Sequence, residues 1–166
     1  AYPSDVTWQM VENFLAGGAA VSVLARQNGI GLTVVDCGVR HDFAPRNGLV
    51  IAKVAPGTAD ALEGPAMSAE QRNQALAHGA ALVKGLPGNA LLLGEMGIGN
   101  TSAASLLMSR LTGLDIVDCT GAGTGLDAEA VQRKIGILLD VLARHPDAQA
   151  PLDVLAAVSY THLTLP

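Results

Sequence analysis

The feature that most constrains the fold is a glycine-rich segment, residues 94–102 (Gly-Glu-Met-Gly-Ile-Gly-Asn-Thr-Ser), which directly follows the apolar run 90–93. A short apolar run of this kind predicts a strand buried on both faces, as in a parallel sheet. Glycines permit a sharp turn, and Asn100, Thr101 or Ser102 is expected to cap the helix that follows. Backbone N–H groups at a helix N-terminus bind anions, most often phosphate. The segment, called here the first glycine loop, therefore predicts an anion site.

A second junction of the same kind follows. Residues 114–119 predict another strand, residues 120–125 (Thr-Gly-Ala-Gly-Thr-Gly) form the second glycine loop, and a helix is expected from Asp127. Open parallel sheets bind ligands at the carboxyl ends of their strands. Neither loop has the lysine of a Walker A motif or the spacing of the dinucleotide fingerprint. Two such junctions favour a ligand site, and two tight turns without a ligand are the alternative.

The remaining pattern alternates strands with helices. Strands are expected at 32–36 and 49–54, and Ser68 with Gln71 forms a capping box for a helix that reaches about Lys84. Ser4 or Asp5 is expected to cap a first helix, and Asn28-Gly29 closes the following apolar helical stretch. His145-Pro146 stops the helix from Asp127. That last helix should turn Val131, Ile135, Leu138, Leu139 and Leu142 inward. The expected fold class is α/β, a doubly wound, Rossmann-like, mostly parallel sheet flanked by helices.

The composition of the chain limits which classes of partner are expected. The chain has 166 residues, a net charge of −5 and no basic stripe, so a nucleic-acid partner is not expected. No apolar run is long enough to span a membrane, so no membrane partner is expected either. Cys37 and Cys119 are too few for a disulfide framework and are expected to be buried thiols, which fits a cytoplasmic location.

The end of the chain follows a different pattern. Residues 151–158 predict a helix, but the helical face does not continue through residues 159–166. We therefore expect residues 1–158 to be the central part of one α/β domain and residues 159–166 to be a non-native tail. The first residue is Ala rather than Met, so truncation is expected there too.

Several ordered motifs resemble one family, the nicotinate-nucleotide–dimethylbenzimidazole phosphoribosyltransferases. Besides both glycine loops, the matching stretches are residues 5–10 (Asp-Val-Thr-Trp-Gln-Met), 34–39 (Val-Val-Asp-Cys-Gly-Val), 53–58 (Lys-Val-Ala-Pro-Gly-Thr) and 63–67 (Glu-Gly-Pro-Ala-Met). The resemblance runs to Val158 and covers about the middle half of the family's length. It implies transfer of the phosphoribosyl group of nicotinate mononucleotide to 5,6-dimethylbenzimidazole, giving α-ribazole 5′-phosphate and nicotinate for the lower ligand of cobalamin.

The resemblance also implies site residues. Glu95 corresponds to a glutamate at the reaction centre, Lys134 to a lysine near the nucleotide phosphate, and Gln9 to a residue beside the benzimidazole. The phosphate and ribose contacts fall on Gly97, Gly99, Asn100, Thr101, Gly121, Gly123 and Gly125. Many family members have Arg at the position of Ala122, so one charge contact is missing here. The family is dimeric, so a homodimer is implied for the full-length protein.

The chemistry explains these residue types. Nicotinate leaves as a neutral pyridine, while positive charge grows on the ribose and a carboxylate can stabilise it. Beside that charge, Glu95 is expected to have a low pKa and to be a weak base. The attacking benzimidazole loses a ring proton, which requires a general base. The family's main base lies beyond Val158, so this chain is expected to be inactive alone. No metal and no cofactor are implied.

Other interpretations stay open. A P-loop-like nucleotide hydrolase and a non-catalytic nucleotide-binding module are the alternative functions. Asp36 is expected to cap the turn after its strand rather than bind substrate. His41 and Asp42 are adjacent and do not face one another, so they do not predict a metal site. Trp8 and Met10 are expected to pack rather than to stack on a ligand.

Overall fold

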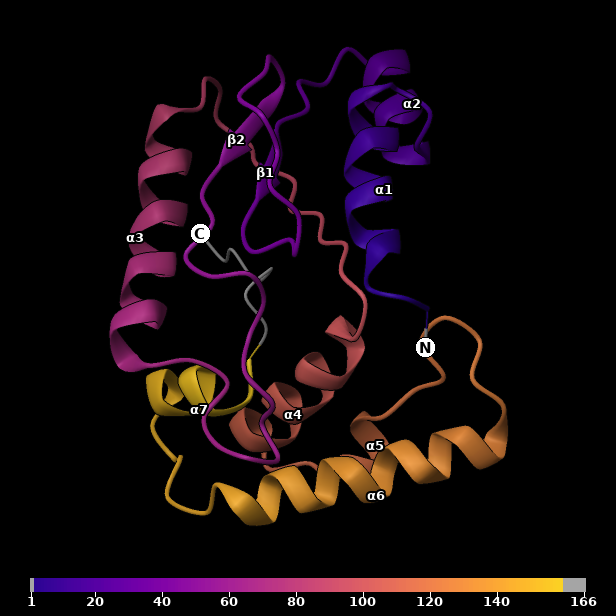
Figure 1. Ribbon diagram of the computed structural model, residues 1–166, viewed down its shortest axis with the longest axis vertical. Helices are drawn as coiled ribbons and strands as arrows, with labels where there is room; N and C mark the ends of the chain where they lie inside the picture. Colours follow the sequence, from indigo (N-terminus) through magenta and orange to yellow (C-terminus); the bar gives the residue numbers. More distant parts are fainter. Residues whose placement is uncertain (1, 160–166) are drawn as a thin grey trace.

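The computed structural model describes residues 2–159, which form helices around a small parallel sheet (Figure 1). The elements in chain order are α1 (Asp5–Leu15), α2 (Ala20–Gln27), β1 (Val34–Asp36), β2 (Leu49–Ile51), α3 (Ala69–Gly85), α4 (Asn100–Thr112), α5 (Ile116–Cys119), α6 (Ala128–Arg144) and α7 (Pro151–Val158). The expected tail lies outside the described residues, except for Ser159, which is buried.

The two strands pair in parallel, with Val34 opposite Leu49 and Asp36 opposite Ile51. In Figure 1 they lie between α3 on one side and α1 with α2 on the other. A small core joins Val11 of α1 to Val39 and Leu49. The outer residues of β2 stay half exposed, because no described element covers them.

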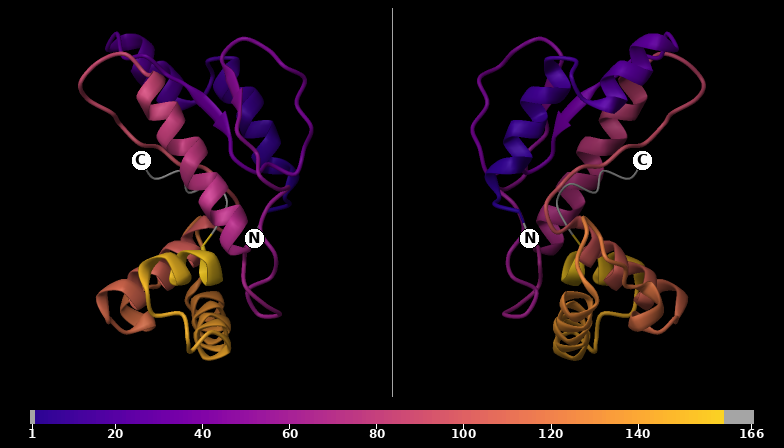
Figure 2. Two further views of the ribbon diagram at one scale, coloured as in Figure 1. Left: turned by 90° about the vertical axis from the view of Figure 1, so that its left-hand side faces the viewer. Right: turned by 90° about the vertical axis from the view of Figure 1, so that its right-hand side faces the viewer.

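A larger core lies at the other end of the molecule, where α4, α5, α6 and α7 gather below the sheet (Figure 2). Its members are Leu106, Ile116, Cys119, Leu138, Val141, Val154, Ala157 and Val158. Apolar residues spaced three or four apart face this core from α6, so that helix buries one stripe and leaves its opposite face to solvent.

Local capping signals are confirmed at α3 and α6 but not at α1, where no side chain forms a cap hydrogen bond. Ser68 and Gln71 form the expected capping box at the start of α3, and Asp127 accepts a hydrogen bond from the backbone of Ala130 at the start of α6. Asn28 ends α2 with Gly29 in the left-handed region, and His145 ends α6. Strands β1 and β2 are confirmed as a parallel pair, although both are shorter than the predicted ranges 32–36 and 49–54. Helix α7 is confirmed.

Two predicted strands are wrong. Residues 90–93 have no regular structure and lie exposed, with Leu92 77% accessible, because no described strand pairs with them. Residues 116–119 form helix α5 instead, because Asp115 caps it through the backbone N–H of Val117. The Ser105 hydroxyl then donates to the Cys119 carbonyl and ties α5 to α4.

Two smaller expectations are also corrected. The N-cap of α4 is Gly99, in the left-handed region, and no side chain among the three proposed residues caps the helix. Leu139 points outward and is half exposed, because the buried stripe of α6 runs through Ile135, Leu138 and Val141. The described chain is thus a mixed α and β structure with one parallel strand pair. Within residues 2–159, no helix combines the length and apolarity needed to cross a membrane.

Candidate functional site

Lys134 of α6 joins the two glycine loops. Its Nζ donates a hydrogen bond to Thr101 Oγ1 at 3.0 Å, in the first turn of α4, and another to the Gly121 carbonyl at 3.4 Å, in the second loop. The loops themselves are in contact, because a Cβ placed on Gly123 would lie 3.1 Å from Thr101 Oγ1. Residues from three separate segments therefore meet at one place.

Backbone geometry explains several of the glycines. Gly99, Gly123 and Gly125 have φ values of 93°, 57° and 99°, in the left-handed region where other residues are strained. Gly97 is buried, and its carbonyl accepts a hydrogen bond from the Asn100 backbone at 3.3 Å. The left-handed conformation of Gly99 leads the first loop into the N-terminus of α4. The backbone dipole of a helix favours anions at this end.

Lys134 has no counter-charge. Among the described residues, no carboxylate lies within 4 Å of its Nζ, and its partners are a hydroxyl and a carbonyl oxygen. Partial burial lowers the pKa of Lys134, because the charged ammonium loses hydration. An anion bound beside Nζ would supply the missing negative charge.

Glu95 lies in the first loop and its carboxylate accepts a hydrogen bond from the Asn100 side chain. The residue is accessible overall, yet nearby protein atoms displace part of the carboxylate's hydration. This desolvation raises the pKa of Glu95, while the bond from Asn100 lowers it. The net direction is upward in the chain without ligand, and the low pKa expected beside a cationic ribosyl centre stays a prediction.

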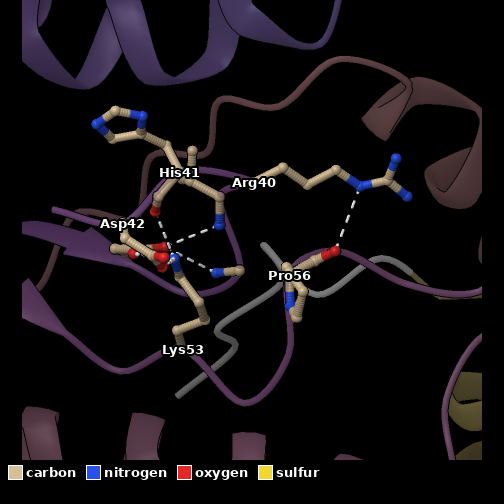
Figure 3. Close-up of polar contacts among 8 residues, drawn as sticks. Arg40, His41, Asp42, Lys53 and Pro56 are labelled. Atoms are coloured by element: carbon tan, nitrogen blue, oxygen red, sulfur yellow. Dashed lines mark hydrogen bonds and ion pairs between the residues drawn. The ribbon is translucent and has the colours of Figure 1, made fainter.

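A different lysine organises the ends of the strands (Figure 3). Lys53 Nζ lies 3.3 Å from Asp36 Oδ2 and 3.6 Å from Asp42 Oδ1. Nζ also donates a hydrogen bond to the His41 carbonyl. Asp36 is fully buried, and its other oxygen accepts hydrogen bonds from the backbone N–H groups of Gly38 and Val39 in the turn. The expected capping role of Asp36 is confirmed.

His41 takes part in packing rather than in a metal site. Its ring stacks on Trp8 with centroids 4.9 Å apart and meets Phe43 edge-on at 4.7 Å. In Figure 3 the His41 ring points away from Lys53, while the Asp42 carboxylate lies near the Lys53 ammonium group. Nowhere in residues 2–159 do three His, Cys, Asp or Glu side chains gather as metal ligands would. Both cysteines are buried, as predicted.

A cavity of about 270 Å³, with polar as well as apolar lining, lies beside the start of α3. Its walls come from both arms of one loop, within residues 54–59 and 65–68, and from Gln71 and Ala75 of α3. We call residues 54–68 the cavity loop. The side chains are mostly small and apolar, and Gln71 and Ser68 bring polar groups to one wall. Such a cavity suits a small flat ligand with few polar atoms.

Comparisons with known proteins identify the family of this chain. The phosphoribosyltransferase family DBI_PRT matches residues 1–163. The chain belongs to this family. A relative from Variovorax paradoxus (strain S110), named nicotinate-nucleotide–dimethylbenzimidazole phosphoribosyltransferase, is 69% identical over 157 residues, which are 95% of this chain and 45% of the relative. A relative of the same name from Aromatoleum aromaticum is 57% identical over 159 residues, and the match covers 94% of this chain and 46% of that relative.

Solved structures lead to the same family. The crystal structure of CobT from Thermus thermophilus superposes with a TM-score of 0.87 at 41% identity, over 99% of this chain and 50% of that one. The chain thus spans about half the length of the relatives it matches.

This phosphoribosyltransferase chain brings most of the predicted site residues together. Glu95, Asn100 and Thr101 lie in sequence along the first loop, and Lys134 links Thr101 to the second loop. Gln9 is different: it is exposed on α1, and none of the described contacts joins it to either loop. The cavity was missed from the sequence, because its wall is an irregular loop whose small residues carry no periodic signal.

Proposed function

We propose that this chain carries the nucleotide-binding part of a nicotinate-nucleotide–dimethylbenzimidazole phosphoribosyltransferase. The reaction moves the phosphoribosyl group of nicotinate mononucleotide to 5,6-dimethylbenzimidazole, and it yields α-ribazole 5′-phosphate and nicotinate in the synthesis of the cobalamin lower ligand. Family membership and the names of the relatives support this assignment. The observation that carries it is Lys134, an uncompensated cation fixed between two glycine loops.

In this proposal the nucleotide phosphate binds where the loops meet. Lys134 supplies the positive charge, and Gly97, Gly99, Asn100 and Thr101 form the start of α4, where the helix dipole favours an anion. Gly121, Gly123 and Gly125 provide the facing wall, where the absence of side chains lets the phosphate and ribose approach the backbone. A charge-assisted hydrogen bond of this type contributes about 1.5–3 kcal/mol.

The reacting centre is assigned to Glu95. The bond between ribose C1′ and the pyridinium nitrogen breaks, and its electron pair neutralises the departing nicotinate ring. A benzimidazole nitrogen forms the new bond to C1′, and the benzimidazole N–H proton goes to a general base. A carboxylate at Glu95 stabilises the positive charge that develops on the ribose.

Two places are candidates for the acceptor base. Gln9 is the position that the family resemblance implies. The cavity beside α3 is the other candidate, because its volume of about 270 Å³ is of the order that a small ligand needs. Gln9→Ala and Gln71→Ala variants separate them: the one that holds the acceptor raises the KM for dimethylbenzimidazole and leaves the KM for the nucleotide unchanged.

Finer features of the full-length enzyme are also proposals. The parallel pairing of β1 and β2 supports a larger doubly wound sheet in the full-length protein. We further propose a cytoplasmic homodimer that acts on small molecules and needs no metal or cofactor, with neither nucleic acid nor membrane as partner. The acidic balance of the chain supports the exclusion of nucleic acid.

The test follows nicotinate release from nicotinate mononucleotide with dimethylbenzimidazole present. The Variovorax relative is the positive control. Two further proteins are measured: the chain alone, and a protein of the relatives' full length that contains this chain. We expect turnover by the full-length protein and little by the chain alone, because the resemblance places the main base beyond residue 158. A positioned base contributes about 10²–10⁴ in rate.

Other outcomes identify the alternatives. A full-length protein that binds the nucleotide in calorimetry without releasing nicotinate would be a binding module. Magnesium-dependent hydrolysis of a nucleoside triphosphate would instead support a P-loop-like hydrolase. Equal turnover by the chain alone and by the full-length protein would make Glu95 the base.

A further inference from the structure

Asn100, the first residue of α4, uses its side chain for something other than capping. Asparagine near a helix start commonly caps the helix, yet the N-cap of α4 is Gly99 and no side chain makes a cap hydrogen bond. The Asn100 amide instead donates from Nδ2 to Glu95 Oε2, five positions back along the chain. The Asn100 backbone N–H also donates into the loop, to the Gly97 carbonyl at 3.3 Å. Asn100 therefore closes the first glycine loop twice, through its backbone and through its side chain.

The Glu95 carboxylate has few other restraints. Its segment has no regular secondary structure, and a Cβ placed on the preceding Gly94 would meet no atom within 4 Å. Within residues 2–159, the carboxylate makes no ion pair, and the Asn100 amide is its one hydrogen-bond partner. A glutamate side chain has several rotatable bonds, so fixing it costs conformational entropy. The bond to Oε2 therefore determines where this carboxylate lies, and it leaves Oε1 available to a ligand.

The same contact favours the ionised carboxylate. An amide N–H only donates, and its hydrogen bond to a charged oxygen is stronger than one to a neutral oxygen. Desolvation raises the pKa of Glu95, and the bond from Asn100 acts in the opposite direction. No cation of the described chain lies within 4 Å of Glu95, and Lys134 donates to Thr101 instead. Asn100 is thus the described group that opposes the loss of hydration at Glu95.

Asn100 is also connected to the phosphate site through the chain. The next residue, Thr101, accepts the hydrogen bond from Lys134 Nζ at 3.0 Å. Because consecutive Cα atoms are about 3.8 Å apart, the residues that hold the carboxylate and the ammonium group are neighbours on the first turn of α4. In a nucleotide the 5′-phosphate and C1′ belong to one ribose unit. A fixed spacing between the two charged groups therefore suits such a ligand.

We propose that Asn100 is a positioning residue, whose side chain holds the Glu95 carboxylate in place and ionised at the ribosyl centre, while its backbone belongs to the anion-binding start of α4. The inference rests on the proposed transferase function. When the bond from C1′ to the pyridinium nitrogen breaks, its electron pair stays with the nicotinate ring and positive charge grows on the ribose. The fixed carboxylate stabilises this charge. Asn100 neither accepts nor releases a proton in this step and acts through Glu95.

This role differs from the one that the family resemblance implies. The resemblance places Asn100 among the phosphate and ribose contacts, whereas the inference assigns that contact to the backbone and a separate task to the side chain. A side chain that binds the nucleotide directly should affect nucleotide binding. One that holds Glu95 should affect the rate of the chemical step. The two roles are therefore distinguishable by kinetics.

The variants are made in a protein of the relatives' full length that contains this chain. Asn100→Ala removes the amide and should fold, because the side chain does not cap α4 and alanine favours a helix. Asn100→Gln keeps an amide donor on a side chain one carbon longer. Thr112→Ala is the matched control, because it removes an exposed side-chain hydrogen bond at the other end of the same helix.

We expect Asn100→Ala to lower kcat for nicotinate release about tenfold, the effect of losing one hydrogen bond to a charged group, and to leave the nucleotide KM within about twofold. The acidic limb of its kcat profile should move to higher pH, because desolvation of Glu95 is then unopposed. Asn100→Gln should recover part of kcat, and Thr112→Ala should match the wild-type protein. A raised nucleotide KM with an unchanged kcat would overturn the inference.

A double-mutant cycle tests whether Asn100 acts through Glu95. In a Glu95→Gln background, Asn100→Ala should change kcat by less than about twofold, because the charged partner is already absent. A purely structural role of Asn100 predicts the same tenfold loss in both backgrounds. That result would contradict the inference.

A titration separates failure of the inference from failure of the proposed reaction. Carbon-13 NMR of protein labelled at glutamate needs no turnover, and the Glu95 carboxyl is the signal that is missing from Glu95→Gln. Asn100→Ala should raise the pKa of Glu95 relative to the wild-type protein. An unchanged or lowered pKa contradicts the inference, whether or not nicotinate is released. A raised pKa in a protein that releases no nicotinate supports the contact and counts against the transferase function alone.

Discussion

Two lysines organise two regions of this molecule in different ways. In the sheet region, Lys53 is paired with the buried carboxylate of Asp36 and lies near Asp42, so its charge is balanced within the protein. In the glycine-loop region, Lys134 has only neutral oxygens as described partners. Both side chains join segments that are distant in sequence. The comparison indicates that a balanced lysine stabilises the fold, while an unbalanced one is available to a ligand.

The packing around the two lysines differs as well. Lys134 is followed directly by the buried Ile135, and its helix lies on the larger core. Lys53 follows a short strand whose outer residues Val50 and Ile51 stay partly exposed. A rigid support suits a binding group, because its position then costs little entropy to fix when the ligand arrives.

The largest expected effect tests this difference in packing. Ile135→Ala should lower the free energy of unfolding by about 2–5 kcal/mol, because a buried side chain is lost and a cavity remains. The same change at Ile51, which is 47% exposed, should cost about 1 kcal/mol or less. Urea unfolding measures both. Equal losses would show that the two regions are packed alike.

The second prediction concerns Lys53. Its removal leaves the fully buried Asp36 carboxylate without its cation, so Lys53→Ala should lower the free energy of unfolding by about 3 kcal/mol. Nucleotide affinity, measured by calorimetry at a temperature where the variant is folded, should not change. A variant that keeps its stability and loses affinity would reverse the roles assigned to the two lysines.

Lys134→Ala should have the opposite effect. We expect nucleotide affinity to fall about tenfold or more, because one charge-assisted contact to phosphate is lost. Stability should change little, since Lys134 has no ionic partner among the described residues. Lys84→Ala, at an exposed position near the end of α3, is the matched control. If Lys134→Ala binds the nucleotide as tightly as the wild-type protein, solvent alone compensates the charge of Lys134 and the phosphate does not.

A smaller effect is expected from contact between the loops. Gly123→Ala should weaken nucleotide binding severalfold, because the added Cβ lies 3.1 Å from Thr101 Oγ1 and displaces a partner of Lys134. Gly125→Ala is strained by its φ of 99° but meets no atom within 4 Å, so it should affect stability more than affinity. If Gly125→Ala weakens binding more than Gly123→Ala, the contact between the loops is not what shapes the site.

The smallest expected effect is the pH dependence of Glu95. Because desolvation raises its pKa, the folded chain holds this proton more tightly than the unfolded chain. The resulting stability is fully present below the ordinary pKa of 4.5 and is lost as the pH rises through the raised value. Relative to Glu95→Gln, the wild-type unfolding midpoint in urea should therefore fall across this pH range. A wild-type midpoint that rises relative to the variant would indicate a lowered pKa.

Sequence alone determined the features that depend on neighbouring residues. The capping box at Ser68 and the cap at Asp127 were predictable, because each uses a side chain and a backbone group three residues apart. Strands β1 and β2 were predictable from their apolar runs. The glycine loops were identified too, and the need for positive φ at Gly99, Gly123 and Gly125 explains why glycine stands there.

Tertiary structure decided what depends on distant partners. Residues 90–93 have the composition of a buried strand, but a strand also requires a neighbour, and the described chain supplies none. Residues 116–119 form helix α5, which the hydroxyl of Ser105, 14 positions away, ties to α4. The cap at Asp115 is local, and the sequence reasoning missed it. The cavity beside α3 depends on loop contacts with α6 and α7, which join residues about 80 to 90 positions apart. Local patterns encode single elements, and the free energy of long-range packing selects how those elements meet.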